Sequence, residues 1–282
     1  MAGLATLKNV ISKLMLPVVL FNAFFTANYN LQVLLVFVVI YSACVIAFII
    51  GNYTKKFVKP YHTFMPFLLT GFEAGMLGYA LYGVLVGTEH ASTFAMIDIG
   101  QTIFVYTIFL AALQSTGGQK PTAKGIIINV LKNPIADGMF LGVFLGILGV
   151  GKYFLSLPIS GVYTQLTSFI TAPAAFLILI VVGYELSLKK ELLRPVFITV
   201  GLRLAIFAIL FVIASALIFA VIPFEKNLMI AIMIMFSLPA PFVIPIFVDV
   251  KKDGEYISTS LSLSTLCTIG LFIAIAVYST IM

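Results

Sequence analysis

The apolar stretch 64–87 of this chain contains one glutamate, Glu73. Glu73 is part of the segment 70–78, where glycines lie close to the carboxylate. Ionisable side chains inside apolar spans cost free energy and mark functional sites by default. We expect Glu73 to couple a proton or cation to the function, or alternatively to be a neutral acid that packs two helices. Gly75 and Gly78 would let a ligand or a second backbone approach closely.

A second interrupted stretch, 237–246, contains Pro239, Pro241 and Pro245. Proline donates no amide hydrogen and clashes with the preceding helical turn, so a regular helix is not expected here. Irregular backbone at membrane depth persists only where protein buries it or where it lines a wet cavity. The free amides of a half-helix attract carboxylates. The candidate substrate-binding residues are therefore Glu73, Ala74, Gly75, Gly78, Pro239, Ala240, Pro241 and Phe242.

Three further charges fall within apolar spans. Asp98 lies about one turn inside its span and is a second candidate for ion coupling, or else a hydrated structural carboxylate. Glu185 and Arg203 are expected at similar depths. Because an unpaired buried charge is costly, we expect these two to form a structural ion pair. A contact between Arg203 and a substrate anion is the alternative.

The composition requires a membrane protein. Of 282 residues, 62% are hydrophobic and 9% are charged, whereas soluble domains carry about 25% charged residues. A soluble or disordered chain is therefore excluded. The net charge of +6 comes from bases in short loops, which indicates membrane topology rather than a nucleic-acid partner. The expected surroundings are a lipid bilayer.

Nine apolar segments approach the length of about 20 residues that a membrane helix needs. They cover 11–28, 32–51, 64–87, 94–114, 134–156, 161–186, 196–221, 227–249 and 257–281. Alternate loops hold nearly all of the 16 Lys and Arg, and such residues accumulate on the cytoplasmic side. We therefore predict an all-α, multi-pass protein of the cell membrane, with its N-terminus in the cytoplasm and its C-terminus outside.

The two predicted breaks, 70–80 and 237–246, occupy comparable places in the two halves of the chain, and paired interruptions are typical of transporters with inverted repeats. We predict one transmembrane domain over 1–282. It would comprise an incomplete first repeat (1–115), a cytoplasmic loop (116–133) and a second repeat (134–282). Glycines 138, 142 and 146 recur every four residues and predict close helix packing, with a homodimer interface as one location.

Motifs for other chemistry are not found in the sequence. Cys44, Cys267, His62 and His90 lack the spacing of metal ligands. Neither a catalytic triad nor a nucleotide-binding motif is present. We expect no enzymatic activity, no metal and no cofactor.

Several segments together resemble the auxin efflux carrier family of membrane transporters, in its bacterial branch. They are 13–21, 75–78, 133–138, 172–186, 238–241 and 258–265. The resemblance implies ten helices in two inverted repeats, whose fourth and ninth helices are broken and cross. This chain looks like that arrangement without its first helix.

The resemblance implies secondary active transport, by efflux or exchange, of small organic anions such as carboxylates, coupled to a proton or ion gradient. This sequence departs from the family pattern, with Glu73 at an asparagine position and Ala80 at a proline position. An ionised Glu73 would repel an anion. Two alternatives stay open: a sodium-coupled symporter of the bile acid:sodium symporter type, and a membrane ligand sensor without transport.

Overall fold

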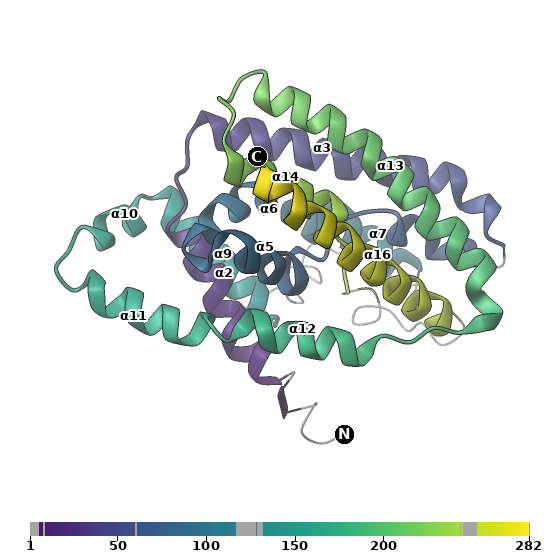
Figure 1. The fold of residues 1–282 in the computed structure, drawn as a ribbon, viewed down its shortest axis with the longest axis horizontal. Coiled ribbons are helices and arrows are strands. Elements are labelled where there is room, and N and C mark those ends of the chain that lie inside the picture. Colours follow the sequence, from purple (N-terminus) through teal and green to yellow (C-terminus); the bar gives the residue numbers. More distant parts are fainter. Residues whose placement is uncertain are drawn as a thin grey trace.

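A computed structural model describes residues 6–7, 9–59, 61–116, 128, 132–242, 244 and 253–281. Within these residues the chain is helical and contains no strand (Figure 1). Five helices are long and apolar enough to cross a membrane: Leu31–Phe57, Thr88–Thr116, Ser160–Gly183, Lys190–Phe219 and Gly254–Ile281. The prediction of an all-α membrane protein is confirmed at this level.

Shorter apolar helices lie between the long ones: Ile11–Phe25, Ala74–Val86, Pro134–Ile147 and Lys226–Ser237. The individual elements before residue 117 are α2 (Leu16–Phe25), α3 (Leu31–Thr54), α4 (Met65–Leu68), α5 (Tyr79–Val86), α6 (Ala91–Phe104) and α7 (Leu110–Thr116). Those after it are α9 (Pro134–Ile147), α10 (Val150–Leu155), α11 (Ser160–Thr171), α12 (Ala174–Glu185), α13 (Leu193–Phe219), α14 (Lys226–Ser237) and α16 (Gly254–Ile281). Most of the predicted cytoplasmic loop, 116–133, lies outside the described residues.

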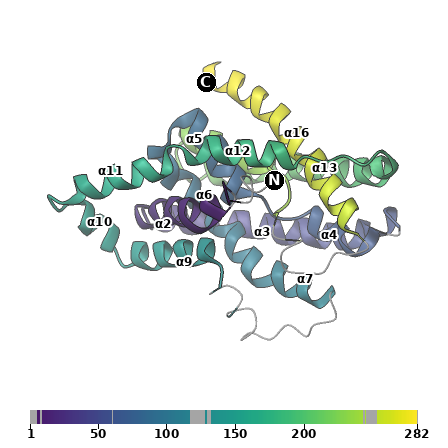
Figure 2. The same cartoon turned by 90° about the horizontal axis from the view of Figure 1, so that it is seen from below.

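Helix α9 begins where the sequence supplies a cap and packs where it supplies glycine. The side-chain oxygen of Asn133 accepts a hydrogen bond from the Ile135 amide at 3.1 Å, and Pro134 follows as the first helical residue. A Cβ atom on Gly138, Gly142 or Gly146 would come within 2.5–2.7 Å of a carbonyl oxygen of α2. The glycine stripe is therefore covered by α2 of the same chain, which lies beside α9 in Figure 2.

The predicted span 64–87 is divided into two helical parts. Helix α4 ends at Leu68, and helical structure begins again at Ala74. Gly71 lies between them with φ +68°, a backbone conformation that favours glycine. The interruption thus covers 69–73, whereas residues 74–80 of the predicted break are helical.

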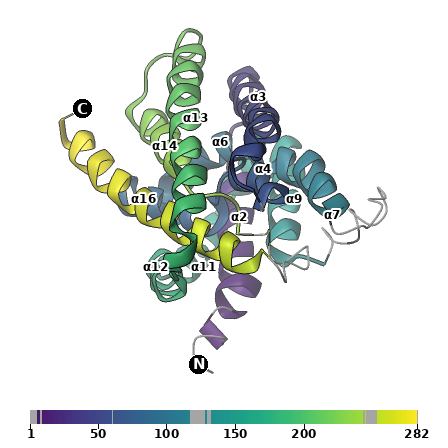
Figure 3. The ribbon, with the colours of Figure 1, turned by 90° about the vertical axis from the view of Figure 1, so that its right-hand side faces the viewer.

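The predicted span 227–249 is interrupted after Ser237. Residues 238–241 are not helical. Between Phe242 and Asp253 only Ile244 is described, so Pro245 and the end of the predicted break at 246 lie outside the described part. Helix α13 is a continuous element that lies against α3, α14 and α16 (Figure 3). It therefore offers a rigid support beside both interruptions.

Candidate functional site

The two interrupted stretches meet through their backbones. The amide of Glu73 donates a hydrogen bond to the carbonyl oxygen of Pro239 at 2.9 Å. Gly71 lies so close to Pro241 that a Cβ atom added to it would be 2.9 Å from the proline Cγ. Segments separated by more than 160 residues are thus in direct contact at the point where each loses its helical structure.

The Glu73 carboxylate bonds to both stretches. Its Oε1 accepts from the Met76 amide at 3.2 Å, in the first turn of the helix Ala74–Val86. Its Oε2 accepts from the Phe242 amide at 2.6 Å, just after the second interruption. A carboxylate is favourable at a helix N-terminus because the free amides carry positive partial charge. Glu73 therefore occupies amides that were predicted to attract a substrate anion.

Arg203 also bonds to both stretches, but it donates to backbone carbonyls where Glu73 accepts from amides. Its guanidinium, on α13, donates from Nη1 to Leu68 O at 3.0 Å and from Nη2 to Gly71 O at 2.6 Å. Nη2 and Nε also donate to Leu238 O, at 2.9 and 3.3 Å. Leu68 ends α4 and Leu238 follows the last residue of α14. No helical turn follows these two residues to supply amide donors for their carbonyls, so the Arg203 guanidinium donates to them instead.

Two aromatic rings enclose the guanidinium. Its Cζ lies 4.5 Å from the ring centre of Phe207 and 5.8 Å from that of Phe72. Cation–π attraction at these distances stabilises a desolvated guanidinium. Arg203 is 2% exposed and does not line the cavity described below. The predicted ion pair with Glu185 involves a side chain outside the described part of the structure.

Asp98 belongs to a polar face on α6. Its Oδ1 accepts from Gln101 Nε2 at 2.9 Å and from Thr102 Oγ1 at 3.0 Å. Gln101 in turn accepts from the Phe72 amide at 3.4 Å, within the first interruption. The network links Asp98 to the interrupted stretch through Gln101. Thr102 was missed by the sequence analysis, although polar residues at spacings of three and four indicate one helix face.

A cavity of about 500 Å³ opens beside this meeting point. Such a volume suits a small organic molecule. Of the predicted site residues, the ones that line it are Glu73, Gly75, Asp98, Pro241 and Phe242. The other residues that contribute polar groups were not predicted as site residues from the sequence: Ser12, Lys13, Gln101, Thr102, Tyr106, Lys132 and Asn133.

The remaining predicted residues contribute to packing around the site. Ala74 and Ala240 are buried. A Cβ atom on Gly78 would lie 2.7 Å from the Phe94 ring and 2.9 Å from a methyl carbon of Leu238. Gly78 therefore allows the first half-helix to approach the second stretch, whereas Gly75 faces the cavity. Pro239 contributes the carbonyl that holds the Glu73 amide.

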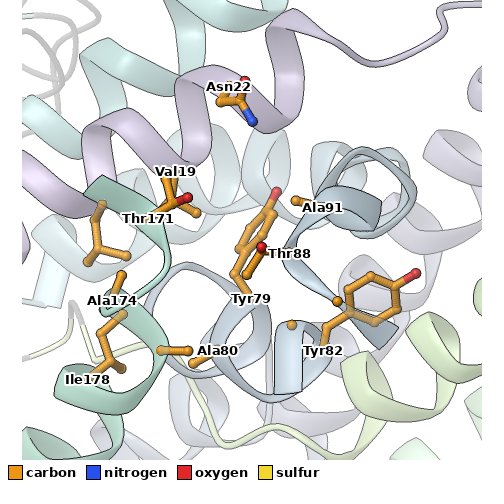
Figure 4. A pocket seen from close by; sticks show the side chains of 14 residues that line it. Val19, Asn22, Tyr79, Ala80, Tyr82, Thr88, Ala91, Thr171, Ala174 and Ile178 are labelled. Atoms are coloured by element: carbon orange, nitrogen blue, oxygen red, sulfur yellow. The ribbon is translucent and has the colours of Figure 1, made fainter. Parts of the chain in front are cut away.

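A second cavity is much smaller, about 30 Å³, and is lined by residues of α2, α5 and α12 (Figure 4). Tyr79 is one of the lining residues and is drawn between Asn22 and Ala80 in the view of Figure 4. This volume holds about one water molecule, which is too little for an organic ligand. Leu16 lines both cavities and lies between them in the fold.

The larger cavity combines carboxylates with basic and aromatic side chains. Among the described residues no three His, Cys, Asp or Glu side chains are grouped as metal ligands. The arrangement offers sites for a proton, for an organic anion near Lys13 and Lys132, and for apolar groups against Met76 and Phe242. Comparison with known proteins gave no matching family model and no matching curated protein.

Proposed function

We propose that this chain is a secondary active transporter of small organic anions, such as carboxylates, coupled to protons. In this proposal nine membrane spans form the crossing fold of the auxin efflux carriers, and the 500 Å³ cavity holds the cargo. One observation carries the proposal: the Glu73 carboxylate, in the cavity wall, bonds to an amide from each interrupted stretch.

The coupling follows from competition for these amides. An ionised Glu73 holds the amides of Met76 and Phe242 and repels an incoming carboxylate. When Glu73 takes up a proton, it no longer repels the anion, and the amides become available to it. Anion binding therefore requires a proton on Glu73, and the two ions move together. For a monocarboxylate the transported unit is electrically neutral.

The direction in which the cavity opens supports alternating access. Lys13 and Lys132 line the cavity. Lys132 belongs to the loop predicted to be cytoplasmic, and Lys13 lies near the predicted cytoplasmic end of the first span. The small cavity is lined by Gly87 and Thr88, which belong to a loop predicted to lie outside. We propose that the described conformation is open inward and closed outward, with Leu16 and Tyr79 in the closed part.

Uptake into proteoliposomes tests this proposal. A panel of radiolabelled mono- and dicarboxylates is offered under a proton gradient or a sodium gradient, imposed separately. We expect accumulation of at least one carboxylate with a proton gradient, stimulated by acidic pH on the side of uptake. Glu73→Gln mimics the protonated acid and should keep anion exchange while losing accumulation. Glu89→Gln, at an exposed carboxylate, is the matched control.

Sodium coupling is the second candidate, because two carboxylates, Glu73 and Asp98, line the same cavity. It predicts accumulation under a sodium gradient with no proton gradient. Ligand binding without any flux in either gradient would instead favour a membrane sensor. Unchanged flux and ion dependence in Glu73→Gln would remove the assigned role of Glu73.

A further inference from the structure

Three carbonyl oxygens converge on one point between the interrupted stretches. They belong to Leu68, Gly71 and Leu238, and all accept hydrogen bonds from the same guanidinium. Helix C-terminal ends carry negative partial charge. Free carbonyls and half-helix C-terminal ends form the sodium or proton sites of many secondary transporters. A group of this kind therefore has the chemistry of a site for a small cation.

Here the cation is part of the chain. A guanidinium stays protonated in proteins, unlike an amine, so the charge of Arg203 is permanent. Its planar fork reaches all three carbonyls, with four hydrogen bonds of 2.6–3.3 Å. Phe72 and Phe207 place their aromatic rings against the guanidinium. The carbonyl oxygens are thus already used by a tethered positive charge.

We infer that the Arg203 guanidinium serves as a built-in cation where the two interrupted stretches meet, and that it sets the ion specificity of the carrier. The guanidinium occupies the carbonyl site that sodium would otherwise use, so the carrier works without sodium. This inference rests on the proposed transport function for its ion-specificity part. Arg203 is a positioning residue, because it holds the C-terminal ends of two half-helices together. Glu73 instead accepts hydrogen bonds from the amides of Met76 and Phe242.

Chemical rescue tests the inference independently of transport. Arg203→Ala is purified in detergent, and its melting temperature Tm is measured in choline chloride with increasing guanidinium chloride, at constant ionic strength. We expect the substitution to lower Tm by roughly 10 °C. Millimolar guanidinium should raise the Tm of this variant with the logarithm of its concentration, as a ligand does. The wild type and Arg194→Ala, at an exposed arginine on the same helix, should show no such rise.

A pair of further variants applies if Arg203→Ala cannot be purified. Arg203→Lys keeps a positive charge in place of the fork, whereas Arg203→Met keeps only the apolar stem. We expect the lysine variant to melt between the wild type and the methionine variant, and the methionine variant to be stabilised by guanidinium. Equal Tm values for the two variants, with no response to guanidinium, would overturn the inference, because Arg203 would then act by packing alone.

The ion-specificity part has a separate readout. Wild-type carboxylate uptake should proceed at the same rate when choline replaces sodium. A requirement for sodium in the wild type would overturn this part even if guanidinium rescues the alanine variant. A chain that moves no carboxylate in any gradient would contradict the proposed function, while the melting experiment would still decide the role of Arg203.

Discussion

The two charged groups at the meeting of the interrupted helices have opposite surroundings. Glu73 bonds to amides and lines a cavity of about 500 Å³. Arg203 bonds to carbonyls, lies against Phe72 and Phe207, and does not itself line that cavity, whereas Phe72 does. Each completes the hydrogen bonds that helix ends leave open. Of these two charged residues, only Glu73 lines the cavity.

This difference suits Glu73 to a role in transport and Arg203 to a role in holding the fold together. A carboxylate that lines a cavity and holds amides can release them when it is protonated. A guanidinium that holds carbonyls between aromatic rings cannot lose its charge. We therefore expect substitutions on the arginine side to change mainly stability, and substitutions on the glutamate side to change mainly transport.

The largest expected contrast is between the two charged residues themselves. Arg203→Gln removes most of the donors for three carbonyls and should lower the free energy of unfolding by about 4 kcal/mol. Glu73→Gln leaves one amide without an acceptor and should cost about 1 kcal/mol. Thermal unfolding in detergent measures both. Equal losses would mean that the two sides do not differ in the way described.

Two glycines on the same half-helix sharpen the contrast. Gly78→Ala places a Cβ atom 2.7 Å from the Phe94 ring and should cost about 2 kcal/mol by overpacking. Gly75→Ala meets only the Glu73 Oε1 at 4.0 Å, so stability should be kept while carboxylate affinity falls. Unfolding and uptake measured on both variants check this. A destabilising Gly75→Ala would place that residue in the packed interface instead.

Aromatic residues on the two sides should differ in the same way. Phe207→Leu removes the ring 4.5 Å from the guanidinium and should cost about 1 kcal/mol of stability. Phe242→Leu keeps an apolar wall but changes the cavity, so the Michaelis constant for uptake should rise with little effect on Tm. The prediction fails if the two variants exchange these effects.

The smallest effect is expected at the edge of the cavity. Lys132 is exposed and lines the cavity, so Lys132→Ala should leave stability within about 0.5 kcal/mol of the wild type. Carboxylate affinity should fall modestly at low salt and approach the wild-type value at high salt, because salt screens exposed charges. A salt-independent loss would indicate direct contact with the cargo instead of attraction at a distance.

The helical class and the presence of two interruptions were predicted from the sequence because their causes are local. Apolar length and the prolines after Ser237 act over a few residues. The same holds for the caps Asn30 and Asn133, which the structure shows and the sequence analysis did not name. The interruption at 69–73 was placed too late, at 70–80. The glycines at 75 and 78 suggested a break there, but a helix tolerates them when Glu73 caps its first turn.

The site was predicted only in part because its contacts are not local. Glu73 and Phe242 were both named as candidates, yet no sequence pattern shows that one bonds the other. Arg203 was expected to pair with Glu185, because a charge partner is the simplest way to bury a charge, and this prediction involves a side chain outside the described part of the structure. Three backbone carbonyls accept hydrogen bonds from the guanidinium, and their position depends on how the interrupted stretches pack. Lys132 and Asn133 reach the cavity through tertiary packing alone.

Proton movement into proteoliposomes tests the central claim most directly. A pH-sensitive dye inside the vesicles reports protons that enter when a transported monocarboxylate is added outside, while radiolabel reports the anion. The account predicts one proton for each anion in the wild type, and anion exchange without proton entry in Glu73→Gln. Proton entry in the glutamine variant equal to that of the wild type would contradict the assignment of Glu73 as the group that couples the two.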